Sequence, residues 1–424
     1  MHLVAIGVNH NTAPIEMRER LAFDDACLGD VLSKLRSNSG VSESCLISTC
    51  NRTEIYAVID QRQNDSVLID FLADYAGIER AELETCAYRY CGHHAAKHLF
   101  QVASGLDSMA LGETQILGQI RSAYCIASDG DHTGSILDNL FQRAIAVGKR
   151  ARTETRISQG AFSIGAAAVE LARFVLGSLD GRTALLVGAG KMSKLATTHL
   201  KSNGIDKVYV CSRTPARVEQ LVEELGGEAV DMDCLEDALR EADVLISSTS
   251  SHDPVITRDL IEKVMSARCR SPIIMIDIAV PRDVEPQVSE LGGVFLYDID
   301  DLRFLVERSE GERQAEVANV MKIVDDETAD FLTHLRSLEA VPLIKQVRAK
   351  FDSVYESEWE RCASKLSHLS DDDRECVRRA LKSAVTKLTH DPIIRMKDYA
   401  ANGGSHKLDV ARELFGIPSD DHKQ

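Results

Sequence analysis

Strand-like and helix-like segments alternate between residue 160 and about residue 305, and this alternation constrains the fold more than any other feature. Short apolar runs lie at residues 184–187, 207–211, 244–247, 273–276 and 294–297. Strands that alternate with helices indicate a parallel sheet with crossover helices. We therefore expect a Rossmann-like α/β domain over residues 157–305 of a multidomain α/β chain.

A glycine-containing turn follows the first of these runs and precedes a helix-like pattern. Its two glycines allow the turn and let backbone amides approach a pyrophosphate, and the helix N-terminus adds partial positive charge. Ser193 takes the place of the third glycine of the usual pattern and is small enough for close packing. The residues predicted to hold a dinucleotide are Gly188, Ala189, Gly190, Lys191, Met192 and Ser193.

The end of the second strand indicates which dinucleotide. NAD-binding chains tend to carry a carboxylate there for the ribose hydroxyls. This chain has Ser212 and Arg213, with Arg217 nearby. Since an arginine suits a 2′-phosphate, we expect NADPH. The sequence has no Gly-x-x-x-x-Gly-Lys run, so we expect no ATP activation by that route.

Cys50 lies in a polar run between two strand-like segments, which end at residue 47 and begin at residue 55. Arg52 is two residues away, and a nearby cation favours the thiolate, the reactive form of cysteine. We therefore expect a nucleophile in a tight turn. The alternative is a buried cysteine that acts as a small hydrophobe.

A nucleophilic cysteine and a hydride donor in one chain imply a covalent intermediate. Attack of the thiol on an ester gives an enzyme thioester, which is electrophilic enough to accept a hydride and yield an aldehyde. Cys50 and Gly188 are expected in different domains. The nucleotide domain must therefore pivot toward the thioester or sit against it.

The segments before and after the parallel sheet follow other patterns. Residues 1–156 mix strand signals with helix patterns at 15–21, 93–102, 115–128 and 135–155, which predicts an α+β domain. Asn11 or Thr12 is positioned to cap the first helix. The polar, glycine-containing loop at 103–113 is long enough to line a site.

Strand signals stop after about residue 303. A seven-residue, mostly apolar repeat runs from residue 317 to 338, Pro342 breaks it, and helix patterns follow at 347–369 and 376–388. Ser370, followed by three aspartates, is expected to start the last helix. An apolar stripe needs another helix to cover it. We expect an all-helical dimerisation domain over residues 306–424; the alternative is packing on its own chain.

Charge and cysteine usage limit the function classes. A net charge of −17 disfavours nonspecific nucleic-acid binding, although five basic residues between 143 and 156 face either a phosphate backbone or solvent. No apolar run reaches 18 residues, so no membrane-spanning helix is expected, and no signal or transit peptide is evident. Eleven scattered cysteines without a Cys-x-x-Cys pair favour a reducing cytoplasm.

Several runs together resemble the glutamyl-tRNA reductase family over essentially the whole chain. They lie at residues 7–14, 48–56, 103–119, 152–155, 188–190 and 277–283. The resemblance implies NADPH-dependent reduction of glutamyl-tRNA to glutamate 1-semialdehyde, the first step of five-carbon tetrapyrrole (porphyrin) synthesis. It also implies a homodimer and a hand-off of the aldehyde to an aminomutase.

The resemblance assigns roles residue by residue. Cys50 matches the nucleophile, and His98 matches a histidine associated with activity, as a proton relay or at the tRNA ester. Arg52 suits the glutamate carboxylate and Glu113 the ammonium. The positions that match substrate-binding residues are Thr49, Asn51, Arg52, Ser108, Glu113, Thr114, Gln115 and Gln119. Thr114 replaces a common proline and Asn11 a common lysine.

Three alternatives stay open at this point. The cluster Cys86, Cys91, His93, His94 and His98 has the residue types of a zinc or haem site, although its spacing fits no common finger and we expect no metal. A Rossmann dehydrogenase of a small molecule, with a structural Cys50, would turn over without tRNA. A non-catalytic RNA-binding scaffold would carry the nucleotide fold without turnover.

Overall fold

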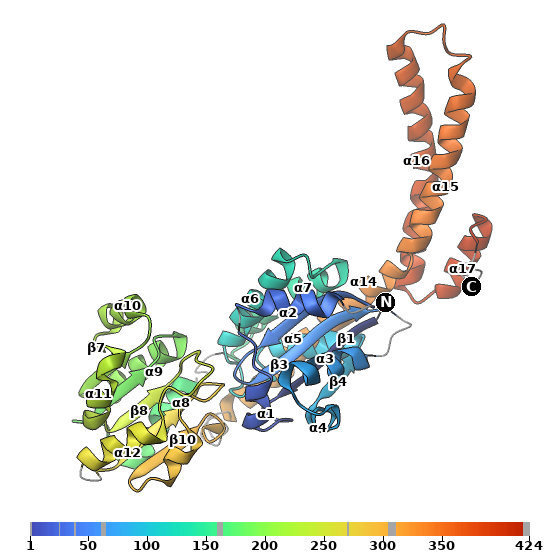
Figure 1. The fold of residues 1–424 in the computed structure, drawn as a ribbon. Coiled ribbons are helices and arrows are strands. Elements are labelled where there is room, and N and C mark those ends of the chain that lie inside the picture. Colours follow the sequence, from blue (N-terminus) through green and yellow to red (C-terminus); the bar gives the residue numbers. More distant parts are fainter. Residues whose placement is uncertain are drawn as a thin grey trace. The chain divides into compact units, whose positions relative to one another are not determined.

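The computed structural model describes residues 2–24, 26–37, 40–60, 65–158, 164–268, 271–303 and 311–418. The chain divides into two compact units, Met1–Asp325 and Asp326–Gln424. The first unit contains two sheets with their helices, and the second is helical (Figure 1). The expected domain bounds at 156 and 305 stay predictions.

An antiparallel sheet forms the first part of the first unit. Its strand order is β2-β3-β1-β4, and β1 pairs antiparallel with both β3 and β4. The strands are β1 (His2–Asn9), β2 (Val41–Ser48), β3 (Arg52–Ile59) and β4 (Tyr88–Cys91). Every residue of β3 is buried, so both faces of the sheet are covered. The turn from β2 to β3 carries Cys50.

Seven helices accompany this sheet in the described residues, and they confirm the expected α+β architecture. They are α1 (Ile15–Arg20), α2 (Leu28–Ser37), α3 (Ser66–Ala76), α4 (Arg80–Cys86), α5 (His93–Ala103), α6 (Gln115–Asp129) and α7 (Ser135–Glu154). The expected cap of α1 is wrong, because Pro14 occupies the N-cap without a side-chain bond. Thr12 Oγ1 instead accepts a hydrogen bond from the backbone N–H of Asn9 at 3.1 Å.

A six-stranded parallel sheet confirms the Rossmann-like prediction. Its order is β10-β9-β8-β5-β6-β7, with every pair parallel. The strands are β5 (Thr183–Val187), β6 (Lys207–Cys211), β7 (Glu228–Val230), β8 (Val244–Ser247), β9 (Ile273–Asp277) and β10 (Val294–Asp298). Sequence reasoning missed only β7 among these strands, because it is three residues long and largely exposed and so has no apolar run.

One helix, α8 (Ile164–Leu176), precedes the first parallel strand, and helices and 3₁₀ turns connect the strands that follow. The connecting elements are α9 (Lys191–Ser202), α10 (Pro215–Leu225), η1 (Met232–Cys234), α11 (Leu235–Glu241), α12 (Arg258–Ala267) and η2 (Pro286–Glu290). One apolar core on a face of this sheet also includes Ile15, Met109 and Ala110 of the antiparallel part. Apolar burial therefore continues from one sheet domain into the other.

Ion pairs from Glu16, Arg18 and Glu19 link α1 to the parallel-sheet domain. Arg282 Nε and Glu19 Oε1 lie 2.8 Å apart, and Arg18 Nη2 lies 2.6 Å from Asp300 Oδ2. The Arg18 side chain is only 2 % exposed, so this contact is partly removed from water. The nucleotide domain thus sits against the Cys50 domain, one of the two arrangements that the sequence left open.

The second unit consists of long helices. The boundary between the units falls within α14 (Gly311–Glu339), and α15 (Val341–Ala363), α16 (Asp371–Ala401) and α17 (Ser405–Leu414) follow. Pro342 breaks the pattern as expected, but it lies in the first turn of α15, which begins and ends six residues before the expected helix at 347–369. The Ser370 side chain caps α16 by accepting from the Asp373 N–H, as expected. The third helix was expected to end at 388, but it continues past Pro392 to Ala401.

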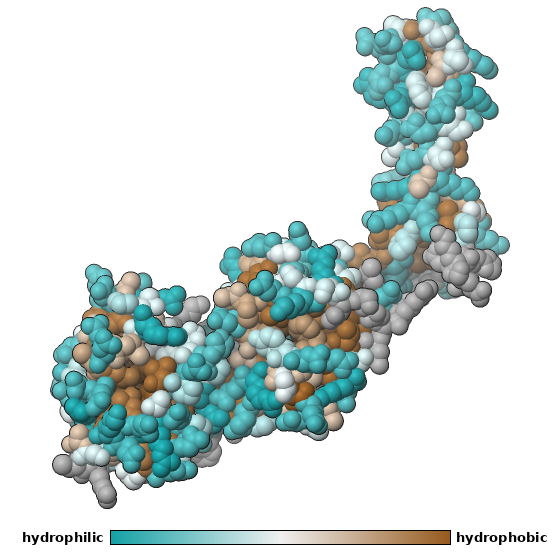
Figure 2. Space-filling view, in the orientation of Figure 1, coloured by the Kyte–Doolittle hydropathy of each residue, from teal (hydrophilic) through white to brown (hydrophobic). Residues whose placement is uncertain are grey.

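Apolar side chains are exposed on this helical unit. Figure 2 shows hydrophobic residues among hydrophilic ones on the surface of α15 and α16. Val354 is 54 % exposed and Leu388 is 72 % exposed. Within its own chain, this unit therefore leaves apolar surface uncovered.

Candidate active site

A hydrogen-bonded turn holds Cys50 between β2 and β3. Thr49 Oγ1 accepts from the backbone N–H groups of Asn51 at 3.2 Å and of Arg52 at 3.1 Å. A threonine hydroxyl that bonds backbone two and three residues ahead stabilises such a turn. Arg18 Nη1 donates to the Cys50 carbonyl at 2.8 Å, so α1 fixes the turn from outside. The predicted tight polar turn is confirmed.

The Arg52 guanidinium is already paired. Its side chain is 1 % exposed, and Nη1 donates to Glu54 Oε1 at 2.6 Å and to Asp107 Oδ2 at 2.9 Å. Nη2 also donates to the backbone carbonyl of Asp107. Arg52, which was expected to bind a substrate carboxylate, is therefore already bound by two carboxylates of the chain itself. Its contacts with Asp107 connect β3 to the 103–113 loop.

Glu54 is the centre of a buried polar network. Its carboxylate accepts from Tyr56 Oη at 2.7 Å and Tyr88 Oη at 2.5 Å, and it lies 3.0 Å from His98 Nε2. Burial alone would raise the pKa of Glu54, but His98, Arg52 and the hydrogen bonds outweigh it and hold the pKa well below its usual range. Glu54 is therefore a buried carboxylate that folding keeps ionised.

Burial dominates the acidity of Cys50. It raises the pKa of this thiol to about 12, and Glu113 raises it further, whereas Arg18 and Arg52 lower it. Arg52 therefore favours the thiolate, as expected, but burial outweighs its effect on the pKa of Cys50. The physical reason is that desolvation disfavours the charged sulfur, and the Arg52 charge is already balanced by Glu54 and Asp107.

A cavity of about 80 Å³ contains the thiol. It brings together eight of the predicted catalytic and substrate-binding residues, Thr49, Cys50, Asn51, Arg52, Ser108, Glu113, Gln115 and Gln119. Sequence reasoning missed Ile116, Ile164 and Ile278, which add apolar lining. Ile164 and Ile278 come from the parallel-sheet part, and an isolated isoleucine in a sequence carries no signal of a site.

Two of the predicted catalytic and substrate-binding residues do not line this cavity. His98 is buried on α5, where it contacts Glu54 rather than Cys50. Thr114 is the N-cap of α6 without a side-chain cap bond, and its carbonyl accepts from Arg152 Nη2 at 2.6 Å. Arg152, one of the basic residues expected at a phosphate or in solvent, thus supports the loop that carries Glu113.

The glycine turn opens into a cleft of about 500 Å³. Gly188 has φ of +108°, and a Cβ there would lie 2.5 Å from the Ser248 carbonyl oxygen, so only glycine fits. Gly190 is the N-cap of α9, and a Cβ built on it meets nothing within 4 Å. This space at a helix N-terminus fits a dinucleotide phosphate.

The remaining predicted nucleotide residues divide into two groups. Those that line the cleft are Gly188, Ala189, Gly190, Met192, Ser212 and Arg213. Ser193 does not line it; its side chain is buried, and its Oγ lies 2.8 Å from Ser248 Oγ, consistent with a packing role for the third position of the motif. The side chain of Lys191 lies outside the described residues.

The thiol cavity and the cleft share three lining residues, Gln115, Gln119 and Met192. Gln115 Nε2 lies 3.1 Å from Met192 Sδ, which joins the start of α6 to the start of α9. A ligand in the cleft and a group on Cys50 are thus separated by one layer of side chains.

The histidine–cysteine cluster does not gather around a common point in the described residues. The one metal-compatible group there is Glu54, His98 and Asp107, whose ligand atoms lie within 4.8 Å of one another. Arg52 Nη1 already contacts two of its three members, so a cationic group occupies this position. In the same described part of the chain, no helix is apolar and long enough to cross a membrane.

Three models of known protein families match successive segments of the chain. The model "Glutamyl-tRNAGlu reductase, N-terminal domain" matches residues 6–155. "Shikimate / quinate 5-dehydrogenase" matches residues 170–305, and "Glutamyl-tRNAGlu reductase, dimerisation domain" matches residues 319–417. With the cleft described above, these matches define an NAD(P)-binding oxidoreductase with a Rossmann-like domain and a helical dimerisation domain. The expected fold class is confirmed.

Full-length relatives identify the family. A glutamyl-tRNA reductase of Heliobacterium mobile is 41% identical over 98% of this chain and 94% of its own, and one of Bacillus pumilus is 39% identical over 100% and 94%. The glutamyl-tRNA reductase structure from Methanopyrus kandleri is 35% identical over 95% of this chain and 98% of its own, with a TM-score of 0.48. The chain belongs to the glutamyl-tRNA reductase family, whose reaction is the first step of tetrapyrrole synthesis. The small-molecule dehydrogenase and the non-catalytic scaffold are set aside.

Proposed function

We propose that this enzyme reduces glutamyl-tRNA to glutamate 1-semialdehyde with NADPH, through a glutamyl thioester on Cys50. The observation that carries the proposal is the shared wall between the thiol cavity and the dinucleotide cleft. A covalently held acyl group next to a hydride donor needs this arrangement.

The first step is attack of Cys50 Sγ on the carbonyl carbon of the glutamyl ester. The C–O bond to the terminal ribose breaks, a C–S bond forms, and the ribose hydroxyl leaves with the proton lost by the thiol. The cleft lined by Gly188, Gly190 and Arg213 would hold NADPH, which would supply a hydride. Hydride addition to the thioester carbon breaks the C–S bond and gives the aldehyde and the Cys50 thiolate, which takes a proton from solvent to restore the thiol. The Thr49 turn keeps the sulfur in place throughout.

Glu113 links substrate binding to the reactivity of the thiol. Its carboxylate lines the cavity and raises the pKa of Cys50. The ammonium group of a glutamyl substrate, placed against Glu113, would cancel this negative charge. We therefore propose that Glu113 binds the ammonium and that substrate binding makes the thiol easier to ionise.

The other polar residues of the cavity orient the substrate. Thr49, Asn51, Ser108, Gln115 and Gln119 present hydrogen-bonding groups to the same small space. Arg52 adds positive charge for the substrate carboxylate while it stays paired with Glu54. His98 acts as a positioning residue in this proposal, because it reaches Arg52 only through Glu54.

The choice of NADPH rests on the positive charge in the cleft. Arg213 and Arg217 both line it after β6. We expect Arg213→Gln to raise the Kd of NADPH by about tenfold or more and leave the Kd of NADH nearly unchanged, because a charge-assisted bond to the 2′-phosphate is worth about 1.5–3 kcal/mol. Fluorescence titration of both nucleotides measures this. Arg182→Gln, which removes a surface partner of Asp243, is the control. An equal loss for both nucleotides would contradict the assignment.

The partners and location follow from other parts of the chain. Exposed Val354 and Leu388 on the helical unit support a homodimer through this unit. The cysteines of the described residues are free thiols, which supports a reducing cytoplasmic location. A reactive amino-aldehyde product favours direct transfer to an aminomutase.

The test of the proposed function is trapping of the intermediate. Radiolabelled glutamyl-tRNA, incubated with the enzyme in the absence of NADPH, is expected to leave label on the peptide that contains Cys50. Addition of NADPH is expected to release this label as the semialdehyde. Label on another cysteine, or none on the protein, would reject the thioester.

A further inference from the structure

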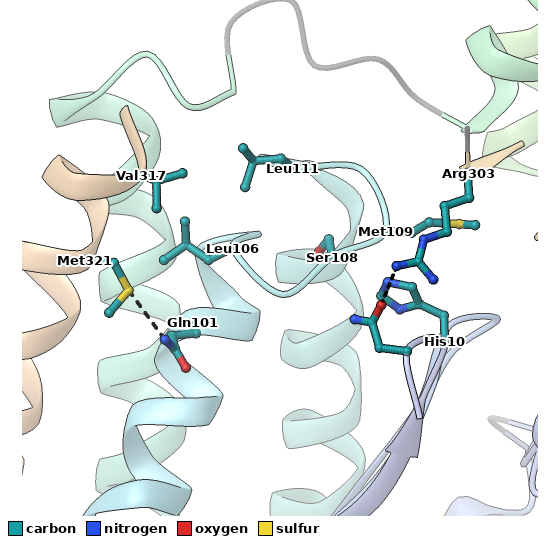
Figure 3. A pocket seen from close by; sticks show the side chains of 10 residues that line it. His10, Gln101, Leu106, Ser108, Met109, Leu111, Arg303, Val317 and Met321 are labelled. Atoms are coloured by element: carbon teal, nitrogen blue, oxygen red, sulfur yellow. Dashed lines mark hydrogen bonds between the residues drawn. The ribbon is translucent and has the colours of Figure 1, made fainter. Parts of the chain in front are cut away.

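A second cavity, of about 360 Å³, borders the thiol cavity on another side. The two share Ser108 from the 103–113 loop. Figure 3 shows the apolar side chains of Leu106, Leu111, Val317 and Met321 on one side, with Ser108 between them and the polar residues. The polar side carries His10 and Arg303, and Arg303 Nη2 donates to Asn11 Oδ1 at 2.9 Å. This cavity has no role in the function proposed above.

The position of the cavity limits what it can hold. In the proposed reaction the glutamyl group is esterified to the last ribose of the tRNA, so the last nucleoside must lie next to Cys50. The dinucleotide cleft borders the thiol cavity through Gln115, Gln119 and Met192, and the cofactor fills it. The cavity behind Ser108 borders the thiol cavity through this shared residue, and it is large enough for a nucleoside.

We propose that this cavity binds the unpaired 3′-terminal adenosine of the substrate tRNA. The proposal rests on the function proposed above, because it places the leaving group of the same reaction. Proteins recognise single-stranded RNA ends by contacts to both faces of a base and by hydrogen bonds to its edges. Leu106, Val317 and Met321 offer an apolar surface for a base face, and a volume of about 360 Å³ admits one nucleoside but no duplex.

The polar side of the cavity fits the edge of a purine or its ribose. Among the described residues, Nδ1 of His10 is buried without a hydrogen-bond partner. Burial, with the charge of Arg52, lowers the pKa of His10 to about 4, so the ring is neutral and offers one donor and one acceptor. The backbone N–H of His10 donates to the Asn51 carbonyl at 2.9 Å. This bond connects the polar side of the cavity directly to the Cys50 turn.

Arg303 adds positive charge at the same side. Its contact with Asn11 joins the end of the parallel-sheet domain to the loop after β1. Asn11 was noted from the sequence as a replacement of a common lysine. The structure places it on the wall of this cavity, beside an arginine that supplies a cationic group there.

A cavity-filling substitution tests the proposal. Val317 on α14 lines the cavity and is half-buried, so Val317→Trp would occupy the space of a base. Ala318→Trp, at the next and exposed position of the same helix, is the matched control. The readout is the rate of label transfer to Cys50 without NADPH, from three labelled donors: glutamyl-tRNA, 3′-O-glutamyl-adenosine and a glutamyl thioester without a nucleoside.

We expect Val317→Trp to slow transfer from both adenosine-containing donors by tenfold or more and to leave the rate from the thioester unchanged. The unchanged thioester rate also shows that the variant is folded. Equal rates for Val317→Trp and wild type with glutamyl-adenosine would overturn the proposal, as would an equal loss with all three donors. A wild-type enzyme that takes label from no donor would instead reject the proposed function.

Discussion

Cys50→Ser is expected to lose glutamyl-tRNA-dependent NADPH oxidation by about 10³-fold or more, because removal of a covalent nucleophile has effects of at least this size. A serine hydroxyl in the same turn is a much weaker acid than a thiol. An oxygen ester on serine would also accept a hydride less readily than a thioester. The variant therefore loses both the attack and the reducible intermediate.

The measurement is the production of semialdehyde and of NADP⁺ from charged tRNA. Cys91→Ser is the control, because Cys91 is an exposed thiol on β4 that does not line the thiol cavity. Binding of glutamyl-tRNA should be nearly unchanged in Cys50→Ser, since the hydroxyl occupies less space than the thiol. If the serine variant produced as much semialdehyde as wild type, the proposed mechanism would be wrong.

Glu54→Ala is expected to destabilise the antiparallel-sheet domain by about 3–5 kcal/mol, the usual cost of removing one member of a buried ion pair. Arg52 would keep Asp107 but lose its closest carboxylate, at 2.6 Å. The hydroxyls of Tyr56 and Tyr88 would also lose their acceptor in the buried network.

Hydrogen exchange of the β3 amides measures this loss, and we expect it to become roughly 10²- to 10⁴-fold faster. Tryptophan fluorescence would not report it, because the single tryptophan, Trp359, lies in α15 of the other unit. Glu84→Ala is the control; Glu84 pairs with Arg80 and Arg89 at the surface, where a change of at most about 1 kcal/mol is expected. Equal exchange in the two variants would refute the role of Glu54 as a hub.

The same carboxylate gives a pH dependence with a definite sign. The folded protein holds the pKa of Glu54 below its ordinary value, so Glu54 contributes stability above that ordinary value. This contribution is lost as the pH falls toward the lowered pKa of the folded state. The β3 amides of wild type should exchange more slowly than those of Glu54→Gln at neutral pH. The difference between the two exchange rates should become smaller as the solution is acidified below about pH 4.5.

Local sequence patterns predicted the regular elements well. β6 and β8 have the expected bounds, because each is one apolar run between polar turns. The start of α16 followed from Ser370 and the aspartates after it, since a helix cap is a contact over three residues. The polar turn at Cys50 was predictable for the same reason: its hydrogen bonds join residues two or three apart.

The electrostatics of the site were not predictable in this way. Arg52 contacts Asp107, 55 positions further along the chain, and Glu54 contacts His98, 44 positions away. From the sequence, Arg52 was a free cation beside a thiol. In the folded chain its charge is balanced, and burial sets the acidity of the thiol instead.

The order of residues along the chain was enough to establish the parallel sheet, the glycine turn, the helical C-terminal segment and the polar turn that carries Cys50, because each depends on neighbours within a few positions. Only the tertiary structure decided which cavities border the thiol cavity and which charges are already paired. Desolvation and ion pairing depend on side chains brought together from distant segments, and no local pattern encodes their final distances.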